Sequence, residues 1–398
     1  MSEAAHIPQL RFPEYSANWS QRLLSDFLIP TLREIEKPKV NYLAIGLRSH
    51  CKGTFQKPDS DPSKIAMEKL FRVKENDLIV NITFAWEGAI AIVKENDEGG
   101  LVSHRFPTYT FDTNITSHHF FKHQFINKRF RYLLDLISPG GAGRNRVMSK
   151  KEFVKLKVPL PSVGEQQKIA AFLTAVDKKI EQLSKKQELL GEYKKGVMQQ
   201  IFSQAIRFKA DDGSTFPEWK EKKLGDIVRF ENGKGHEQNI SKDGKFIVVN
   251  SKFISSQGRV KKYTDTQKSP LNFGDVVMVM SDVPNGKALA KCYYIEQDNL
   301  YSLNQRICGL KHKLADTKFI YYRINRHKYF LSFDSGVGQT NLKKMEILNC
   351  PLNIPTDIKE QAKIANFLSS VDNKIEQMGK QLDESKQFKK ALLQQMFV

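Results

Sequence analysis

The stretch EQQKIAAFLTAVDKKIEQ at residues 165–182 occurs a second time as EQAKIANFLSSVDNKIEQ at residues 360–377. Thirteen of the eighteen positions are identical, and the register continues without a gap to Phe202 in one copy and Phe397 in the other. The repeat length of 195 residues is far longer than the ~20–50 residues of a solenoid repeat. The chain of 398 residues is therefore expected to be an internal duplication, with each half ending in the same segment.

The repeated segments predict two long helices. Apolar residues recur every three or four positions in a heptad seam, and no proline occurs between 165 and 202. The helices are expected to begin just after Pro161 and Pro355, because proline disfavours helix in the residue before it. About 38 residues span roughly 57 Å, and an apolar seam of that length needs a helical partner. We expect that partner to be the other copy in the same chain; a homodimer of seams is the alternative.

The halves also begin alike and differ in the middle. Phe12-Pro13-Glu14 with Trp19 corresponds to the run Phe216–Trp219, whereas the middles match only loosely. Strand-like runs there favour mixed α/β domains joined to the helices. We therefore expect a constant frame of helices that carries two different recognition domains. The predicted domains are 1–160, a helix at 161–205, 206–355 and a helix at 356–398. The predicted strands are Val40–Leu47, Leu78–Ile82, Ala89–Val93, Phe246–Val249, Val276–Met280, Ala288–Ile295 and Arg306–Leu310.

The composition points to a polyanionic partner. There are 63 Lys and Arg against 44 Asp and Glu, which gives a net charge of +19. This favours nucleic acid, although a coiled-coil scaffold with a solubilising basic surface is a second reading. No apolar run is long enough for a membrane span and no signal peptide is visible. Four scattered cysteines without a C-x-x-C pair indicate buried thiols in a reducing cytoplasm.

Signatures of catalysis are missing from the sequence. There is no P-loop, no Asn/Asp-Pro-Pro-aromatic tetrapeptide, no H-E-x-x-H helix and no nucleophile elbow. The histidines at 118, 119 and 123 are expected to form a basic, solvated or phosphate-facing stretch rather than a metal site. A stand-alone DNA enzyme would need acidic groups in each half, and the one aligned acidic pair, Asp77 and Asp275, is interpreted as turn residues.

Short loops of basic and amide residues, most of them bounded by glycine, are the candidates for contact with nucleic acid. Arginine suits guanine edges, and asparagine or glutamine suits adenine edges, because each can form two parallel hydrogen bonds. Most such residues nevertheless contact phosphate in known interfaces. The candidates are His104, Arg105, Arg144, Asn145 and Arg146 in the first half, and Lys234, His236, Asn304, Gln305, Arg306, Gln339, Thr340, Asn341 and Lys343 in the second.

The chain resembles the specificity subunit of a type I restriction-modification enzyme. The likeness rests on the openings at Phe12–Trp19 and Phe216–Trp219, the LP-x-x-x-EQ-x-KIA-x-FL segment at Leu160–Leu173 with its second copy after Ile354-Pro355, and the two helices that end in Gln-Gln. The second copy carries one extra residue before its Glu-Gln pair. The first opening also departs from the repeat, with a longer spacing between its glutamate and tryptophan.

The resemblance implies a non-catalytic protein. In that family two target-recognition domains each read half of a bipartite site in double-stranded DNA, and two antiparallel helices set the spacing. Two methyltransferase subunits and two motor-nuclease subunits dock on this frame, and they hold S-adenosylmethionine, ATP and magnesium; no cofactor is expected in this chain. Independently, a pseudo-two-fold relation of the halves places Phe397 near the chain's own N-terminal region.

Overall fold

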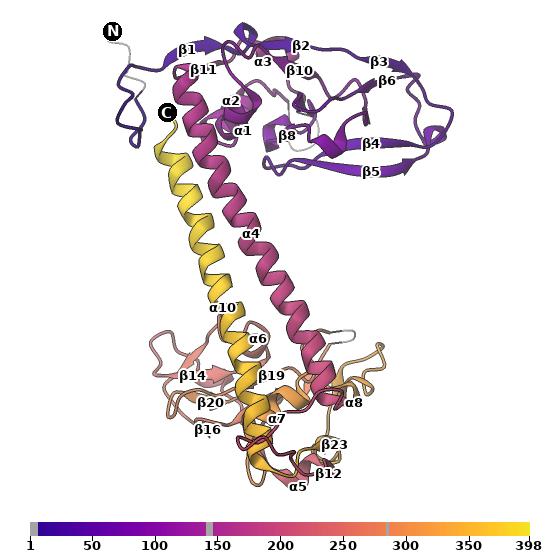
Figure 1. Ribbon diagram of the computed structural model, residues 1–398, viewed down its shortest axis with the longest axis vertical. Helices are drawn as coiled ribbons and strands as arrows, with labels where there is room; N and C mark the ends of the chain where they lie inside the picture. Colours follow the sequence, from indigo (N-terminus) through magenta and orange to yellow (C-terminus); the bar gives the residue numbers. More distant parts are fainter. Residues whose placement is uncertain (1–6, 141–145, 284–285) are drawn as a thin grey trace. The chain divides into compact units, whose positions relative to one another are not determined.

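The computed structural model describes residues 7–140, 146–283 and 286–398, which form two compact units. Unit 1 comprises Met1–Lys185 with Gly379–Val398, and unit 2 comprises Lys186–Met378. Two long helices, α4 (Val163–Phe202) and α10 (Ile358–Gln395), each contribute one segment to both units (Figure 1). Each unit therefore combines one variable half with segments of both constant helices.

The long helices begin shortly after Pro161 and Pro355, as predicted. In each unit the beginning of one helix lies beside the end of the other, so the two segments run antiparallel. In unit 1 the Lys389 ammonium is 2.5 Å from the Asp177 carboxylate, and in unit 2 Lys194 is 2.6 Å from Asp372. In each unit a lysine near the end of one long helix is thus paired with an aspartate of the facing helix.

Within each unit, the beginning of one apolar seam is buried together with the end of the other. In unit 1 Ile169 and Leu173 share one core with the end of α10, and in unit 2 Ile364 and Leu368 share one core with the end of α4. Burying a side chain of this size contributes roughly 1.5–3 kcal/mol. The prediction of an intramolecular helical partner is confirmed in both units.

Within the described residues, the sheets of unit 1 have the orders β1-β11, β2-β10-β7-β8 and β3-β6-β9-β4-β5. Short helices α1 (His118–Gln124), α2 (Lys128–Leu136) and α3 (Lys150–Val154) complete the unit. The strands are β1 (Ser20–Leu23), β2 (Leu28–Pro30), β3 (Glu34–Glu36), β4 (Tyr42–Leu47), β5 (Thr54–Ser60), β6 (Lys69–Arg72), β7 (Leu78–Val80), β8 (Ile90–Ile92), β9 (Leu101–Val102), β10 (Thr108–Phe111) and β11 (Lys157–Leu160).

Unit 2 repeats the first two of these sheets as β12-β23 and β13-β21-β17-β19, and its described residues add the sheets β15-β14-β20-β16 and β18-β22. Its short helices are α5 (Leu224–Ile227), α6 (Ser251–Ser255), α7 (Thr317–Ile324), α8 (Lys328–Leu331) and α9 (Lys344–Leu348). The strands are β12 (Lys220–Lys223), β13 (Val228–Asn232), β14 (Phe246–Val249), β15 (Tyr263–Thr264), β16 (Pro270–Leu271), β17 (Val276–Val279), β18 (Ser281–Asp282), β19 (Cys292–Tyr294), β20 (Tyr301–Leu303), β21 (Ile307–His312), β22 (Thr340–Asn341) and β23 (Pro351–Ile354).

A triad of aromatic rings marks the core of each unit where the constant helix ends. In unit 1 the Phe120 ring centroid lies 6.3 Å from that of Trp19 and 5.6 Å from that of Phe397. In unit 2 the Phe319 ring stands 6.4 Å from Trp219 and 6.1 Å from Phe202. The tryptophans of the two openings and the last phenylalanines of the two helices therefore hold equivalent places.

The N-terminal region of the chain meets the end of α10, as the pseudo-two-fold argument predicted. The Leu10 amide donates to the Gln395 carbonyl at 2.9 Å, and the Trp19 ring lies 6.2 Å from that of Phe397. The predicted strands all occur, some of them shortened at one or both ends. No helix in the described part of the chain is both long and apolar enough for a membrane span.

Candidate nucleic-acid interface

In unit 2 the predicted loops converge on one edge of the sheet β13-β21-β17-β19. Its strands pair antiparallel, so β13 and β17 end where β21 and β19 begin. The loop after β13 carries Lys234, and the turn before β21 carries Asn304 to Arg306. The segment after β17 pairs with β22, which contains Thr340 and Asn341. Candidate residues that are more than a hundred positions apart in sequence thus meet at this edge.

Two backbone hydrogen bonds tie these loops to each other through Met280. The Met280 amide donates to the Arg306 carbonyl at 3.0 Å, and the Leu342 amide donates to the Met280 carbonyl at 2.8 Å. Arg306 has a positive φ of 65°, which turns the chain sharply before β21. Its guanidinium is exposed and has no acidic partner among the described residues. The turn therefore presents an arginine that is free to bind an anion or a base edge.

The exposed amide side chains at this edge form a few solvent-exposed hydrogen bonds. Gln305 donates to the Glu237 carboxylate at 2.6 Å, and Gln339 donates to the Ser281 hydroxyl at 2.6 Å. Asn341 is exposed beside Gln339, at 3.4 Å. These contacts are local and solvent-exposed, so a ligand with matching donors and acceptors is able to replace them.

The structure corrects the role given to His236. This side chain is completely buried, with Nε2 2.8 Å from the Ser302 hydroxyl and Nδ1 3.3 Å from the Asn304 side-chain oxygen. It has no surface to offer a ligand, and it instead fixes the loop that carries Lys234. Gly233 lets this loop pack closely against Asn304, because a Cβ at this position would collide with the Asn304 carbonyl. A histidine in a glycine-bounded loop was interpreted as a surface residue because burial of a short loop leaves no periodic pattern in sequence.

Some of the remaining candidates of unit 2 are exposed, and the others are buried or half-buried and hold the loops in place. Lys234 and Lys343 are exposed, and Lys343 occupies the residue before α9, where its amide donates to the Glu346 carboxylate at 2.7 Å. Thr340 is buried, and its hydroxyl lies 3.1 Å from the Asp334 carboxylate. Thr340 therefore anchors β22 rather than facing outward, whereas Asn304 is half-buried beside His236.

Unit 1 repeats the same backbone pattern with different side chains. The Ile82 amide donates to the Arg105 carbonyl at 3.0 Å, and the Met148 amide donates to the Ile82 carbonyl at 2.8 Å. Ile82 thus takes the place of Met280, and Arg105 takes the place of Arg306. Both arginines are exposed, so His104-Arg105 in unit 1 corresponds to the turn at Arg306 in unit 2.

The loop before α3 was expected to supply Arg144, Asn145 and Arg146. Arg144 and Asn145 lie outside the described residues. Arg146 is half-buried and occupied: its guanidinium donates to the Ser138 carbonyl at 3.0 Å, pairs with Asp135 at 2.7 Å and stacks 5.1 Å from the Trp86 ring. The structure therefore gives Arg146 a role in closing this loop.

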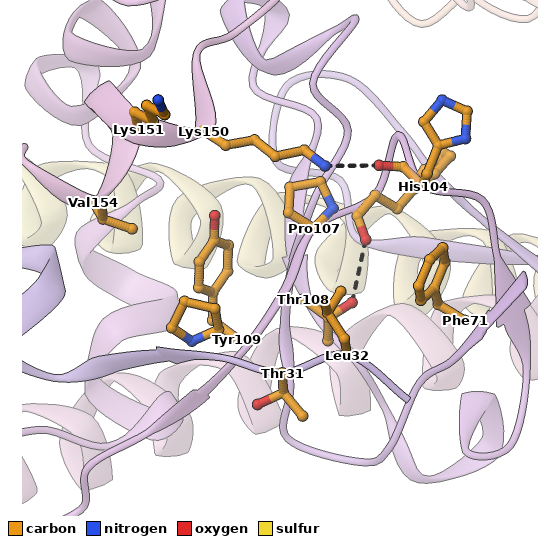
Figure 2. A pocket seen from close by; sticks show the side chains of 12 residues that line it. Thr31, Leu32, Phe71, His104, Pro107, Thr108, Tyr109, Lys150, Lys151 and Val154 are labelled. Atoms are coloured by element: carbon orange, nitrogen blue, oxygen red, sulfur yellow. Dashed lines mark hydrogen bonds between the residues drawn. The ribbon is translucent and has the colours of Figure 1, made fainter. Parts of the chain in front are cut away.

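A cavity of about 450 Å³ opens beside His104 in unit 1 (Figure 2). The Lys150 ammonium donates to the His104 carbonyl at 3.0 Å across its rim, and Lys151 follows on the same helix. The interior is mainly apolar and aromatic. It is lined by Pro30, Thr31, Leu32, Phe71, Phe106, Pro107, Thr108, Tyr109 and Val154.

The acidic pair Asp77 and Asp275 has a structural role, as predicted. Each carboxylate accepts the backbone amide three residues before it, from Lys74 at 2.8 Å and Asn272 at 2.9 Å. Asp77 also receives the Arg33 guanidinium at 2.5 Å, and both aspartates are buried. They therefore stabilise the turns before β7 and β17 and offer no acidic site for catalysis.

The histidines of α1 do not form a metal site among the described residues, and only part of the cluster faces solvent. His119 is exposed, His118 is half-buried and His123 is buried. Burial lowers the pKa of His123 to about 3, with the charges of Lys122 and Lys389 acting in the same direction. His123 thus belongs to the neutral interior rather than to a phosphate-facing surface.

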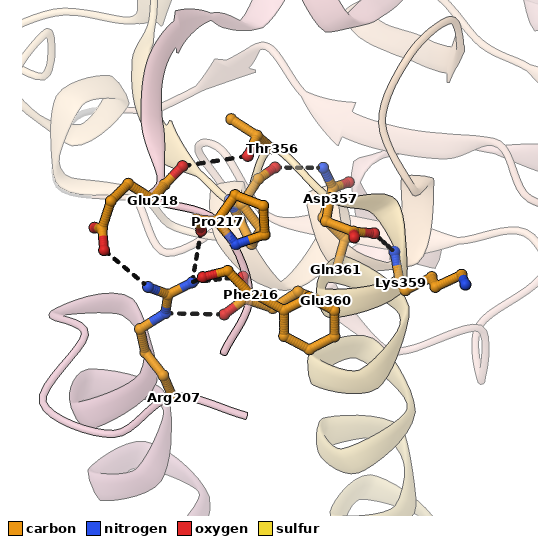
Figure 3. A network of polar contacts seen from close by, with 10 residues as sticks. Arg207, Phe216, Pro217, Glu218, Thr356, Asp357, Lys359, Glu360 and Gln361 are labelled. Carbon is orange, nitrogen blue, oxygen red and sulfur yellow. Dashed lines mark hydrogen bonds and ion pairs between the residues drawn. The ribbon is translucent and has the colours of Figure 1, made fainter. Parts of the chain in front are cut away.

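A buried ion pair fixes the opening of each unit to its long helix, and sequence reasoning did not identify it. In unit 2 the Arg207 guanidinium donates to both Glu360 carboxylate oxygens, at 3.1 and 3.0 Å, and to the Pro217 carbonyl at 2.8 Å (Figure 3). In unit 1 Arg11 donates twice to Glu165 at 2.7 Å. These hydrogen bonds raise the pKa of each arginine. The signal in the sequence was an arginine that precedes each opening.

Comparisons with known proteins agree with this duplicated plan. The model of the type I restriction modification DNA specificity domain matches residues 28–190 and again 217–386. The chain is 27% identical over 270 residues to the type I restriction enzyme MjaVIII specificity subunit of Methanocaldococcus jannaschii, and 24% identical over 262 residues to the putative MjaX specificity subunit of the same organism. The MjaVIII match covers 62% of each chain, and the MjaX match covers 62% of this chain and 59% of the relative.

Two solved structures share the fold. The S subunit of a type I restriction-modification system from M. genitalium superposes with a TM-score of 0.63 at 16% identity and covers 98% of this chain and 99% of that one. A chain from a study of complex assembly and conformational transition of the type I R-M system gives 0.55 at 14% identity, over 94% and 96%. The family model matches most of the chain, once in each unit, and the chain belongs to the type I restriction modification DNA specificity family.

Proposed function

We propose that this chain is the DNA-reading subunit of a type I restriction-modification assembly. The observation that carries the proposal is the loop edge that occurs once in each unit. The same backbone bonds hold Arg105 in unit 1 and Arg306 in unit 2, and both guanidinium groups are exposed. A net charge of +19 supports a polyanionic ligand.

Each unit reads one half of a bipartite site in double-stranded DNA. The shared arginine suits either a guanine edge or a phosphate, whereas the neighbouring groups differ between the units. Unit 2 adds Gln305, Gln339 and Asn341, and unit 1 adds His104 together with Arg144 and Asn145, which lie outside the described residues. Different side chains on one backbone frame are what two different half-sites require.

The constant helices set the distance between the two reading edges and bind the partner subunits. Two methyltransferase subunits dock on this frame, and two motor-nuclease subunits join them in the restricting assembly. The chain itself is non-catalytic: S-adenosylmethionine, ATP and magnesium are bound by those partners, and the chain works in the cytoplasm. Support comes from the structural use of Asp77 and Asp275 and from the missing donor-binding and P-loop motifs.

The deciding experiment is to coexpress the chain with a cognate methyltransferase subunit and to map methylated adenines by single-molecule sequencing. The expected result is a motif of two short specific parts separated by a spacer of fixed length. The purified chain alone, supplied with S-adenosylmethionine, is expected to leave DNA unmodified. A single continuous motif, or methyl transfer without a partner, would contradict the proposal.

The role of the helices as a spacer is tested separately. Four residues inserted into α4 with a matched insertion in α10 lengthen the helix pair by about one turn, or ~6 Å. The spacer between half-sites is then expected to grow by one or two base pairs, at ~3.4 Å each, while both half-sites keep their sequence. An unchanged spacer would show that another element sets the distance.

A further inference from the structure

At the place in unit 2 that corresponds to the cavity beside His104, the protein has an aromatic side chain of its own. In unit 1, Tyr109 of β10 pairs with Leu78 on one side and Pro30 on the other. In unit 2, Leu310 of β21 pairs with Val276 on one side and Phe230 on the other. Phe230 therefore stands where unit 1 has Pro30, and Pro30 lines the cavity.

The lysines above these positions also correspond. Lys344 is the first residue of α9, and its ammonium lies 5.6 Å from the centre of the Phe230 ring. Lys150 is the first residue of α3 and lines the rim of the cavity. Unit 2 thus seats an aromatic ring under a lysine, whereas unit 1 has the lysine and the space but a proline in place of the ring.

The lining of the cavity suits a planar ring that comes from outside. Phe71, Phe106 and Tyr109 supply aromatic surface, and Figure 2 shows the Phe71 ring on the side of His104 and the Tyr109 ring on the side of Val154. Aromatic and apolar walls with a few polar groups at the rim are typical of sites for ring-shaped ligands. The volume of about 450 Å³ falls within the range of small-ligand sites, ~300–1,000 Å³.

The rim of the cavity is basic. Lys150 and Lys151 are exposed, and the Lys150 ammonium donates to the neutral His104 carbonyl. The turn that ends in Arg105 borders the same rim. A ring that carries an anionic group on its flank fits this arrangement, because the ring enters the apolar interior while the anion stays beside two ammonium groups.

We propose that the cavity of unit 1 receives one unstacked nucleobase of the bound DNA, with its flanking phosphate beside Lys150 and Lys151. This inference rests on the proposed function and deepens it. Extruding a base costs a few kcal/mol, which stacking on aromatic walls offsets. A ring from a protein partner fits the walls as well, but it would leave two lysines at the rim without an anion. Unit 2, which has its own Phe230 at that place, reads its half-site without capturing a base.

The test uses the complex of the chain with its methyltransferase subunit and the site that the methylation map defines. Each base of the first half-site is replaced in turn by its photoreactive analogue, and crosslinked residues are identified by mass spectrometry. One position is expected to crosslink to Phe71, Phe106 or Tyr109. No analogue in the second half-site is expected to crosslink to the residues around Phe230.

Two substitutions at Pro30 separate ring capture from general damage. Pro30→Phe supplies the ring that unit 2 carries, so it is expected to abolish the crosslink and to weaken binding of the first half-site roughly 5- to 150-fold, the range that loss of one stacked base gives. Pro30→Val removes the proline without supplying a ring, and it is expected to keep the crosslink. Both variants are expected to recognise the second half-site as the unaltered chain does.

Two results would overturn the inference while leaving the proposed function intact. One is a complex that binds its bipartite site with no crosslink to the cavity walls. The other is a Pro30→Phe variant that binds DNA normally but loses affinity for the methyltransferase subunit without DNA, which would assign the cavity to a protein side chain. A complex that recognises no bipartite site would instead contradict the proposed function itself.

Discussion

Unit 1 and unit 2 are alike where they meet the long helices and differ at the loop edge of the sheet. Next to the long helices, an arginine forms an ion pair with a buried glutamate in both units, and an equivalent triad of aromatic rings packs in the core. At the other end, the shared backbone bonds display different side chains. The contacts that join each unit to the long helices are therefore the same in both units. The side chains at the loop edge differ, while the backbone hydrogen bonds that hold the edge are kept.

The two units differ in a second, smaller way inside the frame. The Trp19 indole donates to Glu165 at 3.3 Å, whereas the buried Trp219 nitrogen has no hydrogen-bond partner among the described residues. In unit 2 the Tyr322 hydroxyl donates to Asp372 at 2.8 Å. In unit 1 the equivalent position is His123, whose ring nitrogens find no hydrogen-bond partner in the part of the chain that the structure describes. The frame thus tolerates changes in single hydrogen bonds but keeps its ion pairs.

The largest effect is expected from removing the buried glutamates. Glu360→Ala removes the buried carboxylate that Arg207 binds and leaves it the exposed Glu218 at 3.6 Å. Glu165→Ala removes the buried carboxylate that Arg11 binds. Losing one partner of a buried pair typically costs about 3–5 kcal/mol. Each substitution is expected to lower the unfolding midpoint of its own unit, measured by hydrogen exchange and thermal unfolding. Glu181→Ala, an exposed glutamate on α4, is the control and is expected to change little.

Equal loss in both units for either substitution would contradict the separate anchoring of the two openings. Arg207→Met combined with Glu360→Ala gives a further check. Replacing both partners by neutral groups is expected to be less costly than removing the glutamate alone, because no uncompensated charge then remains.

The arginines at the loop edges test the reading side of the comparison. Arg306→Ala is expected to weaken binding by about 1–3 kcal/mol and to relax only the half-site read by unit 2, if its guanidinium meets a base edge. Arg105→Ala is expected to do the same for the other half-site. Binding to DNA with single changes in each half-site measures both. A loss that is uniform over all sequences would reassign the arginines to phosphate.

Gln339→Ala is the companion variant for adenine reading. Among the described residues its amide hydrogen-bonds with Ser281 and Asn341, both exposed contacts, so the substitution is expected to leave the fold unchanged and to relax the half-site of unit 2 alone. No effect on binding would remove β22 from the DNA interface.

The duplication, the long helices and the places of the seam were predictable because they follow from residue spacing. Ile169 and Leu173 are four positions apart and lie on the same buried face of their helix. Comparison of the two halves aligns them with Ile364 and Leu368, which are buried as well. The contact between the N-terminal region and Gln395 followed from the duplication alone.

The candidate site was less predictable because loops carry no period. His236 and Arg306 both lie in short loops with basic and amide residues, but His236 is buried and Arg306 is exposed. The difference depends on Ser302 and Asn304, which reach His236 only after the chain has folded. The correspondence of Arg105 with Arg306 likewise depends on backbone bonds to Ile82 and Met280, which no motif records.

A pH effect on stability is expected from His123, the position where unit 1 differs from Tyr322 of unit 2. The pKa of His123 is held at about 3, far below its ordinary value of ~6.5, so between these values the unfolded chain binds a proton that the folded unit does not. Stability of unit 1 therefore rises with pH across this window and falls on acidification, by about 2 kcal/mol between pH 7 and pH 5 from this group.

His123→Tyr places in unit 1 the residue that unit 2 has at Tyr322. The variant is expected to lose one proton from the acid unfolding of unit 1, read as a shallower dependence of its unfolding free energy on pH between 6.5 and 4. Because His327 in unit 2 also has a pKa lowered by burial, to about 4, the acid response of unit 2 serves as the internal reference. An unchanged slope in unit 1 would mean that His123 titrates normally.

The smallest effect on DNA binding is expected from changing the charge at one position, the residue before the short helix that follows the loop edge. Unit 2 has Lys343 there, exposed, and unit 1 has Ser149, whose hydroxyl accepts the Glu152 amide at 3.3 Å. If Lys343 contacts phosphate, Lys343→Ser is expected to weaken binding of all sequences alike and to flatten the slope of log affinity against log salt by about 0.9, the value for one phosphate on duplex DNA. Ser149→Lys is expected to steepen that slope by a similar amount, because it adds the cation at the equivalent place. Titrations over a series of salt concentrations, with the half-site sequences unchanged, measure both. A change in sequence preference, or a slope that moves in only one of the two variants, would show that the edges of the two units do not meet DNA in equivalent ways.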